Sequence, residues 1–511
     1  MTKQAWLSVV ILLALGAAVY GFKLGDGGFA YTEGHRVQPA YEMLDGENAE
    51  ARWLVPRLFG RPYLRKPPGI QWLIAGSTQV FGRSEFSARA VSAGMTIGGG
   101  LLVFAFARRW YGESGGLASG VGYLLMPVLL EGGRAAEIEA SHQLFVLLAC
   151  LPMLDLLLYE RDRLGLLRSA MVALGLFGMI LTKGPAGLPV VGGVLLASWW
   201  VDRSAGVYKR ASLWFGLAVG LGIAGLVYWW IFNASQQFDD VVLQSPGEFL
   251  FNKDKLIAIL TLPALAFVAG LPCSIAAIFP FGPFAAREAA MSRAEVSRRR
   301  MALGVSWAFL IAVGIYMLSG VSNPRYTWPA VVLLPVTVGY VWVGLGERTF
   351  VRLRMVLGRV VMLGHPAVVL VVLLGVALAY PWTIEAERRG TSGDAVAGEI
   401  NQAVGRWQLP DDFNYTPPTG DLHANGLVEV RVEAMMPVDW RIRWSTESEI
   451  VSALTGNGWA LLRTDGSPSE YERIRVSVPE GLEVRFEGEV AGKPFVLVGR
   501  GKLWAPQSAL E

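Results

Sequence analysis

Charged residues are scarce in this chain. Asp, Glu, Lys and Arg make up 17% of its 511 residues, whereas a typical soluble protein has about 25%. Hydrophobic residues account for 53% and the mean hydropathy is positive. There is too little polar side chain to cover a large soluble surface, which excludes a soluble cytosolic enzyme and a disordered regulator. The composition therefore predicts a polytopic membrane protein.

Cysteine is also scarce, with only Cys150 and Cys273, both inside apolar runs. Two such residues exclude a disulfide scaffold and a cysteine-based zinc cluster. No HExxH or CxxC spacing is present, so the sequence predicts neither a dedicated metal site nor another cofactor, although a divalent cation joining two carboxylates stays open. The net charge of +3 is too small to indicate a nucleic-acid partner.

Apolar runs of a length that can cross a membrane recur along the first three quarters of the chain. A spanning helix needs about 20 mostly apolar residues, and about eleven such runs are present. The runs are residues 5–22, 87–107, 115–130, 141–158, 167–181, 185–201, 212–232, 256–280, 302–319, 327–345 and 363–380. The first run has Lys3 ahead of an apolar core, like a signal peptide, and we interpret it as a retained first helix.

Arginine and lysine gather in alternate loops between these runs. All the basic loops fall on one side if eleven helices alternate, and that side is predicted to be the cytoplasm, together with the N-terminus. The opposite side then receives the long first outer loop, residues 23–86, and everything after residue 380. The basic loops contain Arg108 and Arg109; Arg161, Arg163 and Arg168; Arg203, Lys209 and Arg210; Arg287, Arg293 and Arg298 to Arg300; and Arg348, Arg352, Arg354 and Arg359.

The chain changes character from Trp382 onward, where charges, proline and glycine return. Period-2 alternation, which is typical of half-buried strands, appears at residues 427–433, 440–444, 471–478 and 482–490. An amphipathic helix is expected around residues 392–404. The sequence thus predicts a transmembrane domain over residues 1–380 and a small soluble α+β domain over residues 381–511, on the extracytoplasmic side.

Three cations lie at predicted outer ends of helices, each beside a proline: Lys66, Lys183 and Arg325. Proline begins or ends a helix, so each cation is expected at a helix terminus near the interface. One interpretation is snorkelling, in which a long side chain simply reaches the headgroups. The alternative is a shared phosphate site, because cations on one surface can stabilise a departing phosphate oxygen.

Acidic residues on the same side open the helix predicted after the second outer loop. The dipole of that helix can stabilise the carboxylates of Glu137 and Glu139 at its N-terminus. Alternatively, a carboxylate there can face Glu33 and orient a substrate. His142, one turn further on, is expected to be a packed polar residue.

The outer-side motifs resemble one family. The stretch TEGHRVQPAYEML at residues 32–44, followed by WLVP at 53–56, GRPY at 60–63 and KPP at 66–68, is similar to the first loop of the C-type glycosyltransferases. The similarity is to their branch of aminoarabinose (lipid A) transferases and protein O-mannosyltransferases. Further matches are Arg134 with Glu139, KGP at 183–185, and Arg325-Tyr326 ahead of Pro329. The resemblance covers residues 1–380 in order and topology.

The resemblance implies an integral enzyme of the bacterial inner membrane with the C-type glycosyltransferase fold. It would move a sugar from a polyprenyl-phosphate donor to a lipid, glycan or protein acceptor, in contact with membrane lipids. Carried over residue by residue, Lys66, Lys183 and Arg325 would hold the donor phosphate, and Glu33 and Glu139 would be catalytic. The acceptor and donor pocket would contain His35, Arg36, Tyr63, Arg134 and Tyr326.

The sequence departs from the family pattern at three of these positions. Thr32 stands where the family usually has Asp, His35 where Arg is frequent, and Glu139 where Asp is common. Since threonine is no general base near neutral pH without help, Glu33 is the predicted base, and a single displacement at the anomeric carbon would invert its configuration. Two alternatives stay open. One is a lipid-linked sugar transporter, and the other is a non-enzymatic envelope assembly factor on the same fold.

Overall fold

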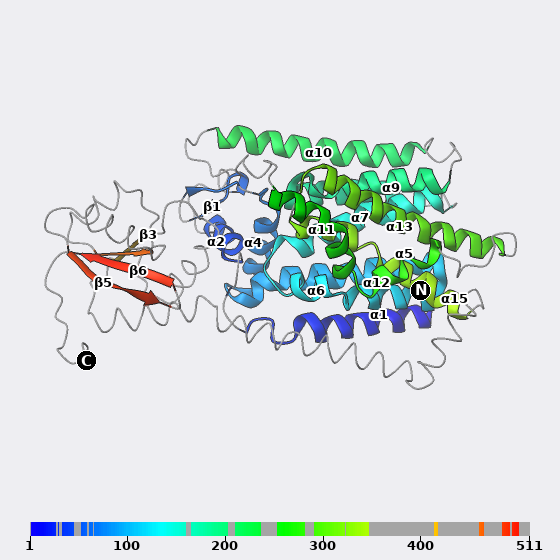
Figure 1. Cartoon of the computed structure of the whole chain (residues 1–511), viewed down its shortest axis with the longest axis horizontal. Helices are drawn as coiled ribbons and strands as arrows, with labels where there is room; N and C mark the ends of the chain where they lie inside the picture. The colour runs from blue at the N-terminus through cyan, green and yellow to red at the C-terminus, as the bar shows by residue number, and fades with distance from the viewer. Residues whose placement is uncertain are drawn as a thin grey trace.

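The computed structural model describes residues 2–26, 29, 33–44, 53–58, 61–64, 66–159, 165–202, 210–236, 253–281, 291–321 and 323–346, and four strands between residues 413 and 499. Long helices run side by side, with α1 (Lys3–Gly16) along one edge and α10 (Ala211–Ser235) along the opposite edge (Figure 1). The helices between these edges are α2 (Gly34–Leu44), α4 (Gly69–Phe81), α5 (Glu85–Leu124), α6 (Pro127–Gly132), α7 (Ile138–Leu158), α8 (Gly165–Lys183), α9 (Leu188–Val201), α11 (Lys253–Ala269), α12 (Cys273–Ala276), α13 (Arg293–Leu318), α14 (Trp328–Val331) and α15 (Pro335–Gly346).

The described helices confirm a multi-pass membrane protein. Seven of them, as continuous segments, are long and apolar enough to cross a membrane, and a bent pair, Ile259–Ala269 with Cys273–Phe281, raises the number to as many as eight. Two of the seven segments, Glu85–Leu124 and Gly165–Val201, each overlap two of the predicted runs. The expected total of eleven stays a prediction, since the last run, 363–380, lies outside the described residues.

The 40 residues of α5 form two helices that fold back on each other. A straight helix of that length would be about 60 Å long, twice the thickness of a bilayer core. Gly112 breaks it, with φ at 80°, in the left-handed region that favours glycine. A Cβ built on Gly120 would lie 3.2 Å from the carbonyl oxygen of Gly100, twenty residues earlier in the same element. The halves therefore correspond to the predicted runs 87–107 and 115–130.

One end of the bundle gathers the N-terminus and residues of two basic loops. Thr2 Oγ1 donates a hydrogen bond to Glu113, which pairs with Arg108 at 2.7 Å. The buried carboxylate of Asp155 accepts a hydrogen bond from Trp110 Nε1 at 2.8 Å and pairs with Arg168 Nε at 2.5 Å. The described cations of these two loops thus share an end, as their parity predicts. Which face of the membrane that end meets stays a prediction.

The first outer loop is folded at the other end of the bundle, where Figure 1 shows α2, α4 and β1. It contains α2, a short antiparallel pair β1 (Arg57–Leu58) and β2 (Arg61–Pro62), and α4. Its core joins α2 and α4 to the start of α5 and to the segment before α7. That core contains Phe29, Val37, Ala40, Ile70, Ile74, Ala75, Ala88, Ala136 and Ile138.

The C-terminal part of the chain contains a four-stranded sheet in the order β3-β4-β6-β5. Its strands are β3 (Phe413–Thr416), β4 (Trp459–Arg463), β5 (Glu483–Val490) and β6 (Lys493–Gly499), with β3 parallel to β4 and the other pairs antiparallel. Strand β5 coincides with the predicted alternation at 482–490. The helix expected at 392–404 and the other three predicted strands lie outside the described residues, and the domain boundary at residue 380 stays a prediction.

Candidate functional site

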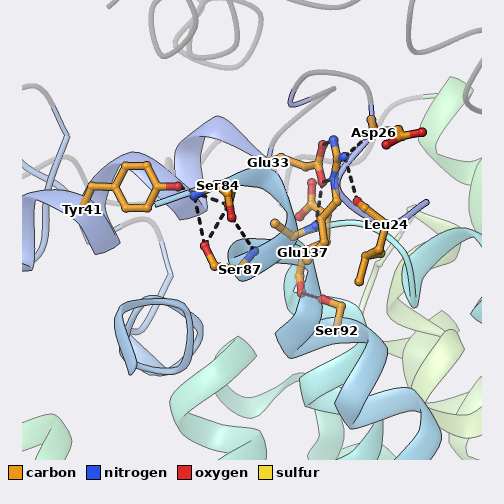
Figure 2. A network of polar contacts seen from close by, with 10 residues as sticks. Leu24, Asp26, Glu33, Tyr41, Ser84, Ser87, Ser92 and Glu137 are labelled. Atoms are coloured by element: carbon orange, nitrogen blue, oxygen red, sulfur yellow. Dashed lines mark hydrogen bonds and ion pairs between the residues drawn. The ribbon is translucent and has the colours of Figure 1, made fainter. Parts of the chain in front are cut away.

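Glu33 forms a buried ion pair at the end of the bundle where the first outer loop lies. Its Oε1 accepts from Arg89 Nε at 2.9 Å and its Oε2 from Arg89 Nη2 at 3.0 Å, and both side chains are 1% exposed. The backbone N–H of Ala136 also donates to Glu33 Oε1, at 2.7 Å. Figure 2 shows Glu33 in this network, with Leu24, Asp26 and Glu137 close by. Both oxygens of the predicted general base therefore accept hydrogen bonds from the protein.

Arg89, near the start of α5, contacts several residues of the first outer loop. Besides Glu33, its Nη1 donates to the carbonyl oxygens of Leu24 at 3.3 Å and Asp26 at 3.0 Å, and its guanidinium lies 5.7 Å from the centroid of the Phe29 ring. Arg89 is not among the site residues predicted from the sequence. The feature of the sequence that could have indicated it is its place as an arginine inside an apolar run, because a charged residue is costly to bury there without a partner.

Arg134 holds the end of the first helical segment. Its Nη1 donates to the carbonyl oxygen of Val19 at 2.7 Å and its Nη2 to that of Phe22 at 2.8 Å. These carbonyls belong to the turn η1 (Ala17–Gly21) and the residue that follows it, where the last groups of a helix need donors. In the described contacts this residue, predicted to line the pocket, thus stabilises a helix end.

Lys66 and Lys183 meet at the side chain of Tyr326. Lys66 Nζ donates to Tyr326 Oη at 3.3 Å, and the ammonium groups of Lys66 and Lys183 lie 5.8 Å and 5.0 Å from the centroid of its ring. Both distances are within the range of cation–π attraction. The structure thereby brings together three predicted site residues from the first outer loop, the end of α8 and the turn η8 (Pro324–Tyr326).

Glu139 connects this group to the start of α7. Lys183 Nζ donates to Glu139 Oε1 at 3.1 Å, and the two side chains are 6% and 10% exposed. Glu139 lies in the first turn of α7, where a carboxylate is favoured by the helix dipole, so the capping position and the ion pair coincide. The charges of Arg325 and Arg36 also act on this carboxylate.

Arg325 lies at the edge of the same group. Its guanidinium is 5.5 Å from the centroid of a Trp328 ring. Its backbone N–H donates to Asn323 Oδ1 at 3.0 Å, which caps η8. Proline at the start of η8 has the fixed φ that such a turn requires, so the Asn-Pro-Arg-Tyr sequence sets where Arg325 and Tyr326 project.

Arg36, His35 and Tyr63 form a second group beside the first. Arg36 Nε lies 3.8 Å from Glu137 Oε2, and Arg36 has a side-chain hydrogen bond with Tyr63. Burial alone would lower the pKa of Arg36, but Tyr63, Glu137 and Glu139 raise it above its ordinary value, so the guanidinium stays charged. The rings of His35 and Tyr63 are nearly parallel, with centroids 6.1 Å apart.

His142 packs against the end of α8. Its Nδ1 lies 3.1 Å from the carbonyl oxygen of Met179 and 3.3 Å from Thr182 Oγ1. Within the part of the chain that the structure describes, no group of three His, Cys, Asp or Glu residues is arranged to hold a metal ion. Thr32, which stands where the family usually has Asp, lies outside that part.

Comparisons with known proteins point to membrane glycosyltransferases. Residues 65–230 match the family model described as dolichyl-phosphate-mannose-protein mannosyltransferase. The chain is 30% identical over 144 residues to undecaprenyl phosphate-alpha-4-amino-4-deoxy-L-arabinose arabinosyl transferase of Aeromonas salmonicida, covering 27% of this chain and 25% of that protein. It is 28% identical over 197 residues to an uncharacterized protein of Aquifex aeolicus, covering 38% of this chain and 37% of that one. The alignments therefore span only about a quarter to a third of those relatives.

The likeness of fold extends over almost the whole chain. The crystal structure of ArnT from Cupriavidus metallidurans in the apo state superposes with a TM-score of 0.68 at 16% identity, covering 96% of this chain and 97% of that one. The structure of the same protein bound to undecaprenyl phosphate superposes with a TM-score of 0.67 at 17% identity, covering 99% and 100%. At such identity the likeness establishes the fold, which is that of ArnT.

Proposed function

We propose that this chain, a C-type glycosyltransferase by its motifs, its matched family and its fold, is an integral membrane enzyme that transfers a sugar from a polyprenyl-phosphate donor. The acceptor is a lipid, a glycan or a protein. The reaction takes place at the outer face of the bacterial inner membrane, at the end of the bundle where the first outer loop lies. The matched family and the fold of ArnT support this assignment.

The observation that carries the proposal is the meeting of Lys66 and Lys183 at Tyr326, with Arg325 beside them. Like charges so close together repel each other in a low-dielectric site, and the carboxylate of Glu139 pairs with one of them, Lys183. A phosphate group, with its negative charge and several acceptor oxygens, is the ligand that such cations stabilise best. We therefore assign these three cations to the donor phosphate.

The transfer is a single displacement at the anomeric carbon of the donor. An acceptor hydroxyl attacks this carbon, its proton passes to a carboxylate, and the bond from the carbon to the phosphate oxygen breaks, leaving polyprenyl phosphate. Lys66, Lys183 and Arg325 neutralise the charge that develops on the leaving oxygen. Glu139 is the carboxylate next to these cations. When a donor phosphate attracts Lys183, the Glu139 oxygen that Lys183 had bound is available to accept the proton.

A second function is a non-enzymatic envelope assembly factor on the same fold. Thr32, which replaces the family's usual Asp, favours it, because loss of an acidic group can leave lipid binding intact while removing turnover. A lipid-linked sugar transporter is favoured less, since transporters place ionisable residues near the bilayer midplane, whereas the described site residues lie where the helices begin and end.

Binding of undecaprenyl phosphate to the purified protein tests the phosphate site. Each charge-assisted contact is worth about 1.5–3 kcal/mol, or roughly ten-fold or more in affinity. The triple variant Lys66→Gln, Lys183→Gln, Arg325→Gln should therefore lose measurable binding. Lys23→Gln is the matched control: this exposed lysine pairs with Asp26 at 3.6 Å, and its replacement should change affinity less than about two-fold.

The outcomes separate the alternatives. If the triple variant and the parent protein bind undecaprenyl phosphate with equal affinity, these three cations do not form the phosphate site. If the parent protein binds the lipid but transfers sugar from no polyprenyl-phosphate donor, the assembly factor is the correct function.

A further inference from the structure

Three buried arginines gather near the first outer loop, and they differ in how many of their buried donors have partners. Arg89 donates to Glu33, Leu24 and Asp26, and Arg134 donates to two backbone carbonyls. Arg36 differs. Its side chain is 8% exposed, yet its Nε and Nη1 are buried with no hydrogen-bond partner among the residues that the structure describes.

The ion pair with Glu137 does not satisfy these donors. The separation of 3.8 Å between Arg36 Nε and Glu137 Oε2 is that of a charge pair and is too long for a hydrogen bond. A buried N–H group without an acceptor is costly, more so when it carries charge. Arg36 is therefore held at a site where it can receive an acceptor from outside the described chain.

The charge around Arg36 limits what that acceptor can be. With Glu137 beside it, the pair has no net charge, so a second anion at Arg36 would be repelled by the nearby carboxylate. A hydroxyl group has two lone pairs to accept from the guanidinium and a proton to donate to the carboxylate. Neighbouring hydroxyls on a sugar ring suit such a pair, and the stacked rings of His35 and Tyr63 add an apolar wall.

The pair also lies next to the phosphate cations. Arg36 and Lys183 both act on the charge of Glu139, and Glu137 and Glu139 are two residues apart at the start of α7. In a polyprenyl-phosphate donor the sugar is bonded directly to the phosphate. Side chains that bind the sugar must therefore lie beside the phosphate site.

We propose that Arg36 and Glu137 bind hydroxyl groups of the donor sugar, and that they select a neutral, hydroxylated glycosyl group over a uronate. This inference rests on the proposed function, because it takes the donor phosphate to lie among Lys66, Lys183 and Arg325. It deepens that function by naming the chemical class of the sugar.

The test compares lipids with and without a sugar, using the purified full-length protein. The probes are undecaprenyl phosphate and undecaprenyl phosphate esterified to mannose, glucose, galactose or galacturonate. The parent protein should bind at least one neutral glycolipid about ten-fold or more tighter than undecaprenyl phosphate, and the galacturonate lipid more weakly than that one. Arg36→Gln and Glu137→Gln should each lose the advantage of the neutral sugar and keep the affinity for undecaprenyl phosphate within about two-fold.

Binding of undecaprenyl phosphate by each variant also shows that the variant is folded, and Arg36→Lys, which keeps the charge, is the second variant should Arg36→Gln fail to fold. If the Arg36 variant loses affinity equally for sugar-bearing and sugar-free lipids, Arg36 belongs to the phosphate site. That result would overturn the inference but not the proposed function. The inference is also overturned if no neutral glycolipid binds the parent protein better than undecaprenyl phosphate. Failure of the parent protein to bind undecaprenyl phosphate at all overturns the proposed function, and the inference with it.

Discussion

The carboxylates of Glu33 and Glu139 are held in different ways, and this difference bears on which of them can take a proton. Glu33 accepts from both Arg89 nitrogens and from the Ala136 N–H, which stabilises its ionised form and makes it a poor base. Glu139 accepts a hydrogen bond from Lys183, itself a predicted ligand of the donor phosphate, and the charges of Arg325 and Arg36 also act on it. We propose Glu139 as the base, because a donor phosphate can draw Lys183 away from it, and Glu33 as a support for the folded loop, whereas the sequence predicts Glu33 as the base.

Conservative substitution of each carboxylate separates these roles. Glu139→Gln should lower the rate of transfer by about 10²–10⁴-fold, the usual contribution of a general base, while undecaprenyl phosphate still binds. Glu33→Gln should instead lower the free energy of unfolding by about 3–5 kcal/mol, because it removes the carboxylate charge that pairs with the buried guanidinium of Arg89. Transfer rates and denaturation curves of both variants provide the measurement. A stable, inactive Glu33→Gln together with a fully active Glu139→Gln would restore Glu33 as the base.

At the scale of elements, the site depends on how closely α7 and α8 approach each other. Glu139 begins α7 and Lys183 ends α8, so their contact requires these helices to pack side by side. The packing is tight at Gly175, where an added Cβ would lie 2.4 Å from the backbone nitrogen of Ala149 and 2.7 Å from the carbonyl oxygen of Phe145. Backbone atoms cannot turn away as a side chain can, so any larger residue there must push the helices apart.

Gly175→Ala should therefore lower the free energy of unfolding by about 1–3 kcal/mol and weaken binding of undecaprenyl phosphate. Gly222→Ala in α10 is the matched control, because an added Cβ there meets nothing within 4 Å. In a helix interior that change should be neutral or stabilise by up to about 1 kcal/mol. Both are measured by denaturation in detergent. Equal effects of the two substitutions would show that the α7–α8 approach is not limited by Gly175.

At the scale of the whole molecule, the two ends of the helical bundle have different chemistry. One end contains the N-terminus with Arg108 and Arg168 and their carboxylate partners. The other contains the folded first outer loop and the cluster around Tyr326. Basic residues remain on the cytoplasmic side during membrane insertion, so the Tyr326 end should face away from the cytoplasm.

Reporter fusions test this orientation directly. A reporter joined after Arg300 should read as cytoplasmic, and one joined after Tyr380 as extracytoplasmic, because an odd number of predicted spans lies between these points. The phosphatase and fluorescence activities of paired reporters provide the measurement. If both junctions read the same side, either the predicted run at 363–380 does not cross the membrane or the assumed parity is wrong.

Local sequence patterns are enough to predict the class of the protein and the position of its cations along the chain. Apolar runs indicated the membrane helices, and the prolines beside Lys66, Lys183 and Arg325 indicated where those helices begin and end. Gly112 shows the limit of this information: the gap between two runs indicated a break, and the contact between Gly100 and Gly120 showed that the halves fold back on each other. Hydropathy and turn preference depend on near neighbours in the chain, which is why they can be read without a fold.

Only the tertiary structure decided which charges meet. Arg89 pairs with Glu33 across 56 residues, and Tyr326 lies against lysines from two distant segments. Two buried donors of Arg36 have no hydrogen-bond partner among the residues that the structure describes. An ion pair depends on distance in space and on the exclusion of water, and both are set by the packing of helices far apart in sequence. For this reason residue types and spacing predicted which residues to consider for the site, whereas the partner of each one, and with it the proposal of Glu139 as the base, came from the fold.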